Sequence, residues 1–175
     1  MQFLIDAFEA IRDFLELGGP VLRVIGINIL FLWILILERL IYFRTGLRSL
    51  IQESLDEWER RPERKSWHAH QVRDAIISRA KMAADNGLPM IQTLVALCPL
   101  LGLMGTVTGM IQVFEVMAIS GTSNARAMAA GVSRATVPTM AGMVGALSGV
   151  FLVTILTRAA KRNTGLLEDE LTMDH

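Results

Sequence analysis

The sequence is poor in cysteine and in net charge, and two long stretches of it hold no charged residue. With a single cysteine, Cys98, the chain can form no internal disulfide. The 17 Lys and Arg residues balance the 17 Asp and Glu residues, so charge does not favour nucleic acid as a partner. Residues 88–114 and 135–157 lack Asp, Glu, Lys and Arg. Each stretch exceeds the ~20 apolar residues that cross a bilayer, which predicts an integral membrane protein.

A third apolar segment lies nearer the N-terminus. Residues 24–37 are apolar except for Asn28, with Arg23 before them and Arg39 shortly after. By length alone these residues could form a buried helix of a soluble protein. Because long arginine side chains reach back to the membrane surface, we expect a transmembrane helix over residues 21–43.

The predicted fold is therefore all-α with three transmembrane helices, the second and third extending beyond the bilayer. Thirteen of the 17 Lys and Arg residues lie at 39–87 and 158–162, which predicts that these parts are cytoplasmic. The predicted order is a periplasmic amphipathic interfacial helix (1–17), transmembrane helix 1 (21–43), a cytoplasmic helical loop (44–87), transmembrane helix 2 (88–114), a short periplasmic connection (115–124), transmembrane helix 3 (125–158) and a cytoplasmic tail (159–175).

No candidate for covalent chemistry stands out. His68 and His70 are two residues apart without a nearby cysteine or matching carboxylate, so we expect a solvated loop there and no metal site. No nucleophile–base pair and no metal-ligand set is recognisable, so we expect no enzyme activity and no cofactor.

Both uncharged stretches carry glycines at the same relative spacing. Small residues three or four apart let helices approach closely in lipid, so we expect helix-packing roles for them. The spacing leaves open whether the glycines face each other or a neighbouring subunit, or are merely tolerated in a membrane helix. The residues are Gly102, Gly105, Gly109, Gly142, Gly145 and Gly149.

Two prolines and two threonines stand out in the same stretches. Pro99 and Pro138 each remove a helical hydrogen bond and predict helix breaks. Thr106 and Thr139 lie on weakly polar faces that would suit a narrow lumen, although a hydroxyl bonded back to its own helix is the ordinary alternative. Neither stretch contains Asp, Glu or His, the groups that usually carry protons across a membrane, so either no proton crosses here or a second chain supplies the carboxylate.

Two segments carry a family resemblance. PLLGLMGTVTGMIQVF (99–114) and AGVSRATVPTMAGMVG (130–145) resemble the second and third spans of the ExbB/TolQ/MotA family. The resemblance implies a bacterial inner-membrane motor subunit that forms a homopentamer, an oligomeric helical barrel. The barrel would enclose an ExbD-like single-span partner that carries a membrane Asp, and this Asp would take the protons.

The resemblance also suggests roles for particular residues. Thr106 and Thr139 match the pore-facing threonines of the family. Arg134 stands where the family has a Glu, and a guanidinium does not release its proton. Arg134 could instead contact an acid of the partner, a lipid headgroup, or Glu115 across the helical hairpin.

The expected function is that of an ExbB-like subunit that energises a TonB-like protein for uptake across the outer membrane. Two alternatives stay open: a TolQ-like motor for envelope maintenance, and a passive membrane scaffold for a partner chain.

Overall fold

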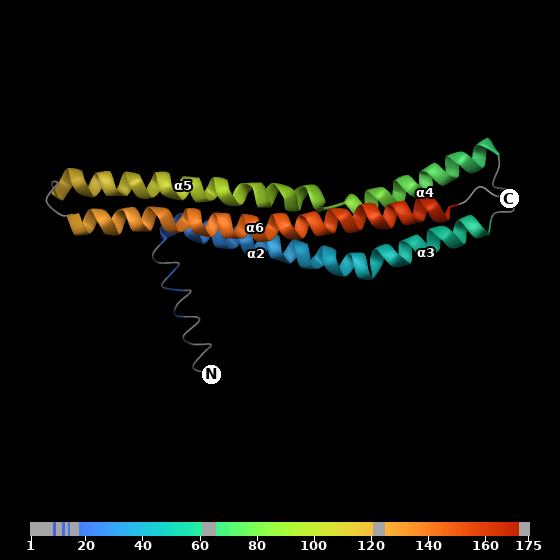
Figure 1. Cartoon of the computed structure of the whole chain (residues 1–175), viewed down its shortest axis with the longest axis horizontal. Helices are drawn as coiled ribbons and strands as arrows, with labels where there is room; N and C mark the ends of the chain where they lie inside the picture. Colours follow the sequence, from blue (N-terminus) through green and yellow to red (C-terminus); the bar gives the residue numbers. More distant parts are fainter. Residues whose placement is uncertain are drawn as a thin grey trace. The chain divides into compact units, whose positions relative to one another are not determined.

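The computed structural model describes residues 18–60, 66–120 and 125–171, together with Glu9, Arg12 and Phe14. The interfacial helix predicted at 1–17 falls largely outside these residues. All regular structure within them is α-helical, in the order α2, α3, α4, α5 and α6 (Figure 1). Three helical stretches are long and apolar enough to cross a membrane, so the predicted fold class is confirmed.

The first membrane helix is followed almost directly by a second, polar helix. α2 spans Gly19–Arg44, and α3 spans Gly46–Glu59. Only Thr45 separates the two, and its hydroxyl donates a hydrogen bond to the Ile41 carbonyl at 3.0 Å. The predicted span at 21–43 therefore lies within α2, and the following chain stays helical.

The helix α4 spans Trp67–Asp85 and corrects one prediction. The expectation of a loop at His68 and His70 is wrong, because both residues lie in the first turn of this helix. Ser66 caps the turn: its side chain accepts a hydrogen bond from the Ala69 backbone N–H at 3.3 Å.

The two longest helices extend well past the predicted spans. α5 covers Leu88–Ser120, and α6 covers Ala125–Glu170. Residues 115–120, predicted as connection, and most of the predicted tail at 159–175 are thus helical. At 1.5 Å per residue, the 33 and 46 residues of these helices exceed a ~30 Å hydrocarbon layer.

Neither proline predicted as a helix break ends its helix. Pro99 lies inside α5, and Pro138 lies inside α6. Each removes one backbone donor from its helix, which lipid-embedded helices tolerate when neighbouring protein covers the site. Pro138 is among the most deeply buried side chains of the chain.

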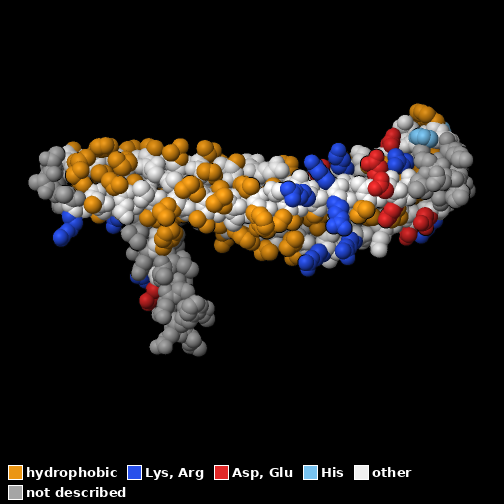
Figure 2. All heavy atoms as spheres, in the orientation of Figure 1, with side chains coloured by type: hydrophobic (Ala, Val, Ile, Leu, Met, Phe, Trp, Pro, Cys, Tyr) orange, Lys and Arg blue, Asp and Glu red, His pale blue; other side chains and the backbone are white. Residues whose placement is uncertain are grey.

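By backbone contacts the chain divides into two compact units. The first comprises residues 1–33 and 93–150, where the segments of α2, α5 and α6 pack together. Its outward-facing side chains are largely apolar, as Figure 2 shows for α5 and α6. The Leu147 side chain, for example, is 72% exposed. Such a surface is unfavourable in water and suits lipid.

The second unit comprises residues 34–92 and 151–175 and has its own core. Arg73 of α4 donates hydrogen bonds to the Leu171 and Glu168 carbonyls, both at 2.9 Å, and so caps the C-terminal end of α6. The buried core cluster joins α3, α4 and the end of α6 and consists of Trp58, Ala69, Ile76, Ala80, Leu167 and Leu171.

A sharp turn connects α4 to α5 in this second unit. Gly87 has φ +78°, in the left-handed region that disfavours residues with a Cβ. A Cβ at Gly87 would also lie 2.7 Å from Nε of Arg39, whose side chain is buried and lies over the Tyr42 ring at 5.2 Å. The turn therefore needs glycine for its backbone conformation.

Candidate functional site

The six glycines singled out in the sequence lie at close helix contacts within the first unit. A Cβ added at Gly102 would lie 3.0 Å from Thr139 Cα, and one at Gly142 would lie 2.5 Å from the Cys98 carbonyl oxygen. At Gly109 it would lie 2.6 Å from Ala135. These contacts join α5 to α6 within one chain.

The remaining glycines extend the same packing. Gly105 lies directly against the Pro138 ring. Gly145 and Gly149 admit side chains of α2: added Cβ atoms there would lie 2.6 Å from Ile29 and 3.1 Å from Leu32. Small residues thus let three helices approach closely, which is how helices associate in lipid without a hydrophobic driving force between them.

Thr139 makes a hydrogen bond across the α5–α6 pair. Its hydroxyl donates to the Gly102 carbonyl at 2.9 Å. Gly102 lies one turn before Thr106 on the same face of α5, so the structure brings the two predicted pore threonines to neighbouring turns. The Thr106 hydroxyl donates back to the Leu103 carbonyl at 2.7 Å, the ordinary bonding of a threonine within a helix.

Arg134 and Glu115 line one cavity without pairing. The cavity has a volume of about 500 Å³ and also exposes Gln112. The Arg134 guanidinium is exposed, and the two side chains form no ion pair with each other within the described residues. A second cavity of about 400 Å³ also includes Arg134 and Gln112. Arg134 therefore remains available to an anion from outside the chain.

Asn28, which in the sequence is only the one polar residue of the apolar segment 24–37, makes contacts between helices. Its amide donates hydrogen bonds to the Leu94 carbonyl and to Sγ of Cys98, each at 3.1 Å. Cys98 is buried and in turn donates to the same Leu94 carbonyl at 3.4 Å. Asn28 thus ties α2 to α5, and the pairing with Cys98 could not have been found without knowing which helix faces meet.

The uncharged stretches of the site offer hydroxyls and carbonyls but no acid. The apolar parts of α5 and α6 contain no Asp, Glu or His between residues 88–114 and 135–157. Threonine hydroxyls can hydrogen-bond water, yet they do not take up a proton near neutral pH. In the described part of the chain no group of three or more His, Cys, Asp or Glu residues could hold a metal ion.

A model of the MotA/TolQ/ExbB proton channel family matches residues 42–169. The chain belongs to this family. Two relatives are the Synechocystis sp. proteins ExbB-like 1, 38% identical over 73 residues, and ExbB-like 3, 30% identical over 83 residues. These alignments cover 40% and 46% of this chain, and 29% and 40% of the relatives. The chain thus matches less than half the length of either relative.

The region that the family model matches includes α5, most of α6 and the candidate residues that these two helices carry. Proton relays across membranes are usually built from Asp, Glu or His side chains. Neither of this chain's two uncharged stretches contains Asp, Glu or His.

Proposed function

We propose that this chain is an ExbB-like motor subunit of the bacterial inner membrane. With an ExbD-like partner, it uses the proton motive force to energise a TonB-like protein that drives uptake across the outer membrane. The observation that carries the proposal is that this member of the proton channel family has no acidic residue in either of its two uncharged membrane stretches. The missing acid comes from the partner's single membrane helix.

The chain acts as a homopentamer with its C-terminus in the cytoplasm and its N-terminus in the periplasm. The excess of Lys and Arg at residues 39–87 and 158–162 supports this orientation. Each proton that crosses a 100 mV potential releases about 2.3 kcal/mol, so repeated steps can drive conformational work. The chain itself catalyses no covalent reaction.

Thr106 and Thr139 line the proton route in this proposal. Their position on neighbouring turns supports it, since the two hydroxyls can then serve one row of water molecules. Arg134 takes the place of the family's Glu and contacts a carboxylate of the partner rather than carrying a proton.

The test is a proton-flux measurement on the complex reconstituted in liposomes. We expect Thr106→Val and Thr139→Val together to lower flux at least tenfold while the complex still assembles. Ser148→Ala is the matched control, because Ser148 lies on the opposite side of α6 from Thr139 and bonds back to the Gly145 carbonyl at 2.9 Å.

The partner's acid provides a second arm of the test. Replacing the membrane Asp of the co-expressed single-span chain with Asn should abolish flux, and Arg134→Glu should lower it because the cation is lost. Undiminished flux in the double threonine variant would refute the lumen assignment. Normal nutrient uptake without any flux would favour the passive scaffold, and an envelope defect with intact uptake would favour the TolQ-like motor.

A further inference from the structure

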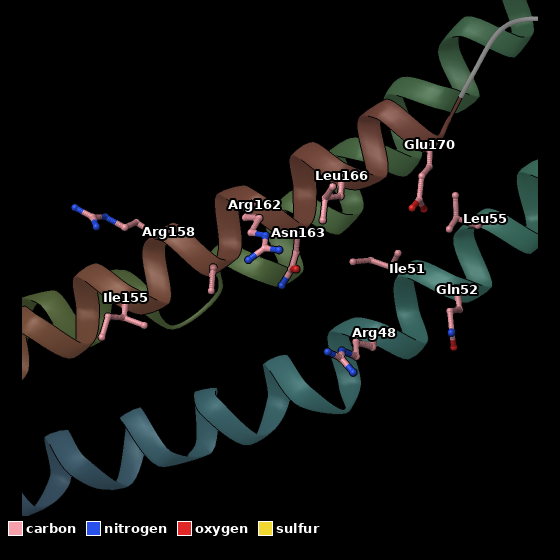
Figure 3. A pocket seen from close by; sticks show the side chains of 11 residues that line it. Arg48, Ile51, Gln52, Leu55, Ile155, Arg158, Arg162, Asn163, Leu166 and Glu170 are labelled. Carbon is pink, nitrogen blue, oxygen red and sulfur yellow. The ribbon is translucent and has the colours of Figure 1, made fainter.

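The second unit contains a cavity that the proton pathway does not use. It has a volume of about 810 Å³ and lies between α3 and α6 (Figure 3). This volume is within the range of small-molecule binding sites. The lining residues combine three arginines, two amides and an apolar wall: Arg48, Arg158, Arg162, Gln52, Asn163, Ile51, Leu55, Ile155, Ala159 and Leu166, with Glu170 at one end.

The charge of this groove is strongly one-sided. The lining contains three arginines and a single acid, Glu170, which leaves a net lining charge of +2. In Figure 3, Arg162 and Asn163 extend from α6 toward α3, where Arg48 lies, whereas Arg158 extends away from α3. None of the three guanidinium groups has an ion pair or hydrogen bond to another described residue. The groove therefore offers unpaired donors of the kind that bind phosphate.

The groove also lies at a boundary along the chain. Arg158 is the first charged residue after the uncharged stretch 135–157 of α6, so the membrane surface falls close to it. Ile155, just before this boundary, is 45% exposed. Apolar surface on the membrane side of a cationic site suits a ligand that is anionic at one end and apolar at the other.

We propose that the groove between α3 and α6 binds an anionic phospholipid at the membrane surface. The lipid phosphate lies between Arg48 and Arg162, with the amides of Gln52 and Asn163 as further donors, and an acyl chain runs along Ile155 toward the bilayer. Phosphate supplies the recognised charge, and the acyl chain distinguishes a lipid from a soluble phosphate. This site is independent of the proton pathway proposed above.

Native mass spectrometry of the detergent-solubilised full chain tests the proposal. The probes are phosphatidylglycerol and phosphatidylcholine with the same acyl chains. We expect selective retention of phosphatidylglycerol. Arg48→Gln and Arg162→Gln should each weaken it about fivefold, the effect expected for one basic residue near a membrane surface. Arg79→Gln is the matched control, since Arg79 is exposed on α4 and does not line the groove.

The acid at the end of the groove supplies a change of opposite sign. Glu170→Gln should strengthen phosphatidylglycerol binding, because it removes the one negative charge of the lining. Circular dichroism establishes that each variant keeps its helices.

Three results would overturn the proposal. The groove arginine variants could bind phosphatidylglycerol as Arg79→Gln does, which would indicate only general attraction to the charged surface. Glycerol phosphate could bind as tightly as the lipid, which would make the groove a site for soluble phosphate. The variants could change the oligomer mass but not lipid retention, which would indicate that a second copy covers the groove.

Discussion

A close helix contact at Gly142 in the first unit predicts a specific cost for adding one methyl group. A Cβ at Gly142 would lie 2.5 Å from the Cys98 carbonyl oxygen and 3.3 Å from the Gly102 Cα. These neighbours are backbone atoms, which cannot rotate away as a side chain can. Overpacking of this kind costs about 1–3 kcal/mol. Alanine is also a better helix former than glycine by roughly 0.5–1 kcal/mol, which offsets part of this cost.

A matched glycine in the same helix separates the two effects. Gly165 also lies inside α6, and a Cβ there would meet nothing within 4 Å. Gly165→Ala should therefore raise the free energy of unfolding by roughly 0.5–1 kcal/mol, the helix-propensity gain alone. The difference between the Gly142→Ala and Gly165→Ala variants then isolates the contact, and we expect it to be about 1–3 kcal/mol.

The assay is SDS-induced unfolding in mixed micelles, followed by circular dichroism. Because the contact joins α5 and α6 of one chain, the loss in Gly142→Ala should not depend on protein concentration. A Gly142→Ala variant as stable as Gly165→Ala would refute the close approach. A loss that disappears on dilution would mean that the methyl group disturbs a contact between subunits instead.

Three further perturbations test the polar and aromatic contacts. Asn28→Val removes both hydrogen bonds from α2 to α5 and should lower the free energy of unfolding by about 0.6–1.7 kcal/mol in the same assay. An unchanged free energy of unfolding would show that these bonds add no net stability. Arg73→Gln removes the cap of α6 and should speed hydrogen–deuterium exchange in its last turn; exchange as slow as in the parent chain would argue against the cap. Trp58→Ala empties the centre of the second unit's core and should cost about 3–5 kcal/mol, seen as faster proteolysis of α3 and α4, and a variant that resists protease equally would contradict this core.

Some features of the fold follow from local pattern. The absence of charge over residues 88–114 and 135–157 predicts membrane helices, because the energetic cost of charge in lipid does not depend on which helices later pack together. Helix ends were harder to predict. Charged residues follow the two uncharged stretches at Glu115 and Arg158, yet α5 and α6 continue past them. In α6 the cap from Arg73 and the burial of Leu167 stabilise the extension.

The candidate site likewise combines features that follow from local pattern with features that depend on packing. The glycine spacing predicts close packing, but it cannot tell which atoms meet, since a helix of regular spacing can present the same face to another part of its chain or to another subunit. The wrong prediction of a loop at His68 has a similar cause. Two histidines and a tryptophan are indifferent helix formers, and the helix is stabilised by the Ser66 cap and by the α4 side chains buried in the core of the second unit.

The sequence by itself determined that this chain enters a membrane, which family it belongs to, and that its uncharged stretches hold no acid, because composition and motif are properties of the linear chain. Only the tertiary structure decided that Thr139 bonds to Gly102, that Asn28 reaches Cys98, and that Arg48 shares a groove with Arg162. Those residues are 37, 70 and 114 positions apart. Their proximity depends on the rotation and register of packed helices, which the hydrophobic pattern leaves undetermined.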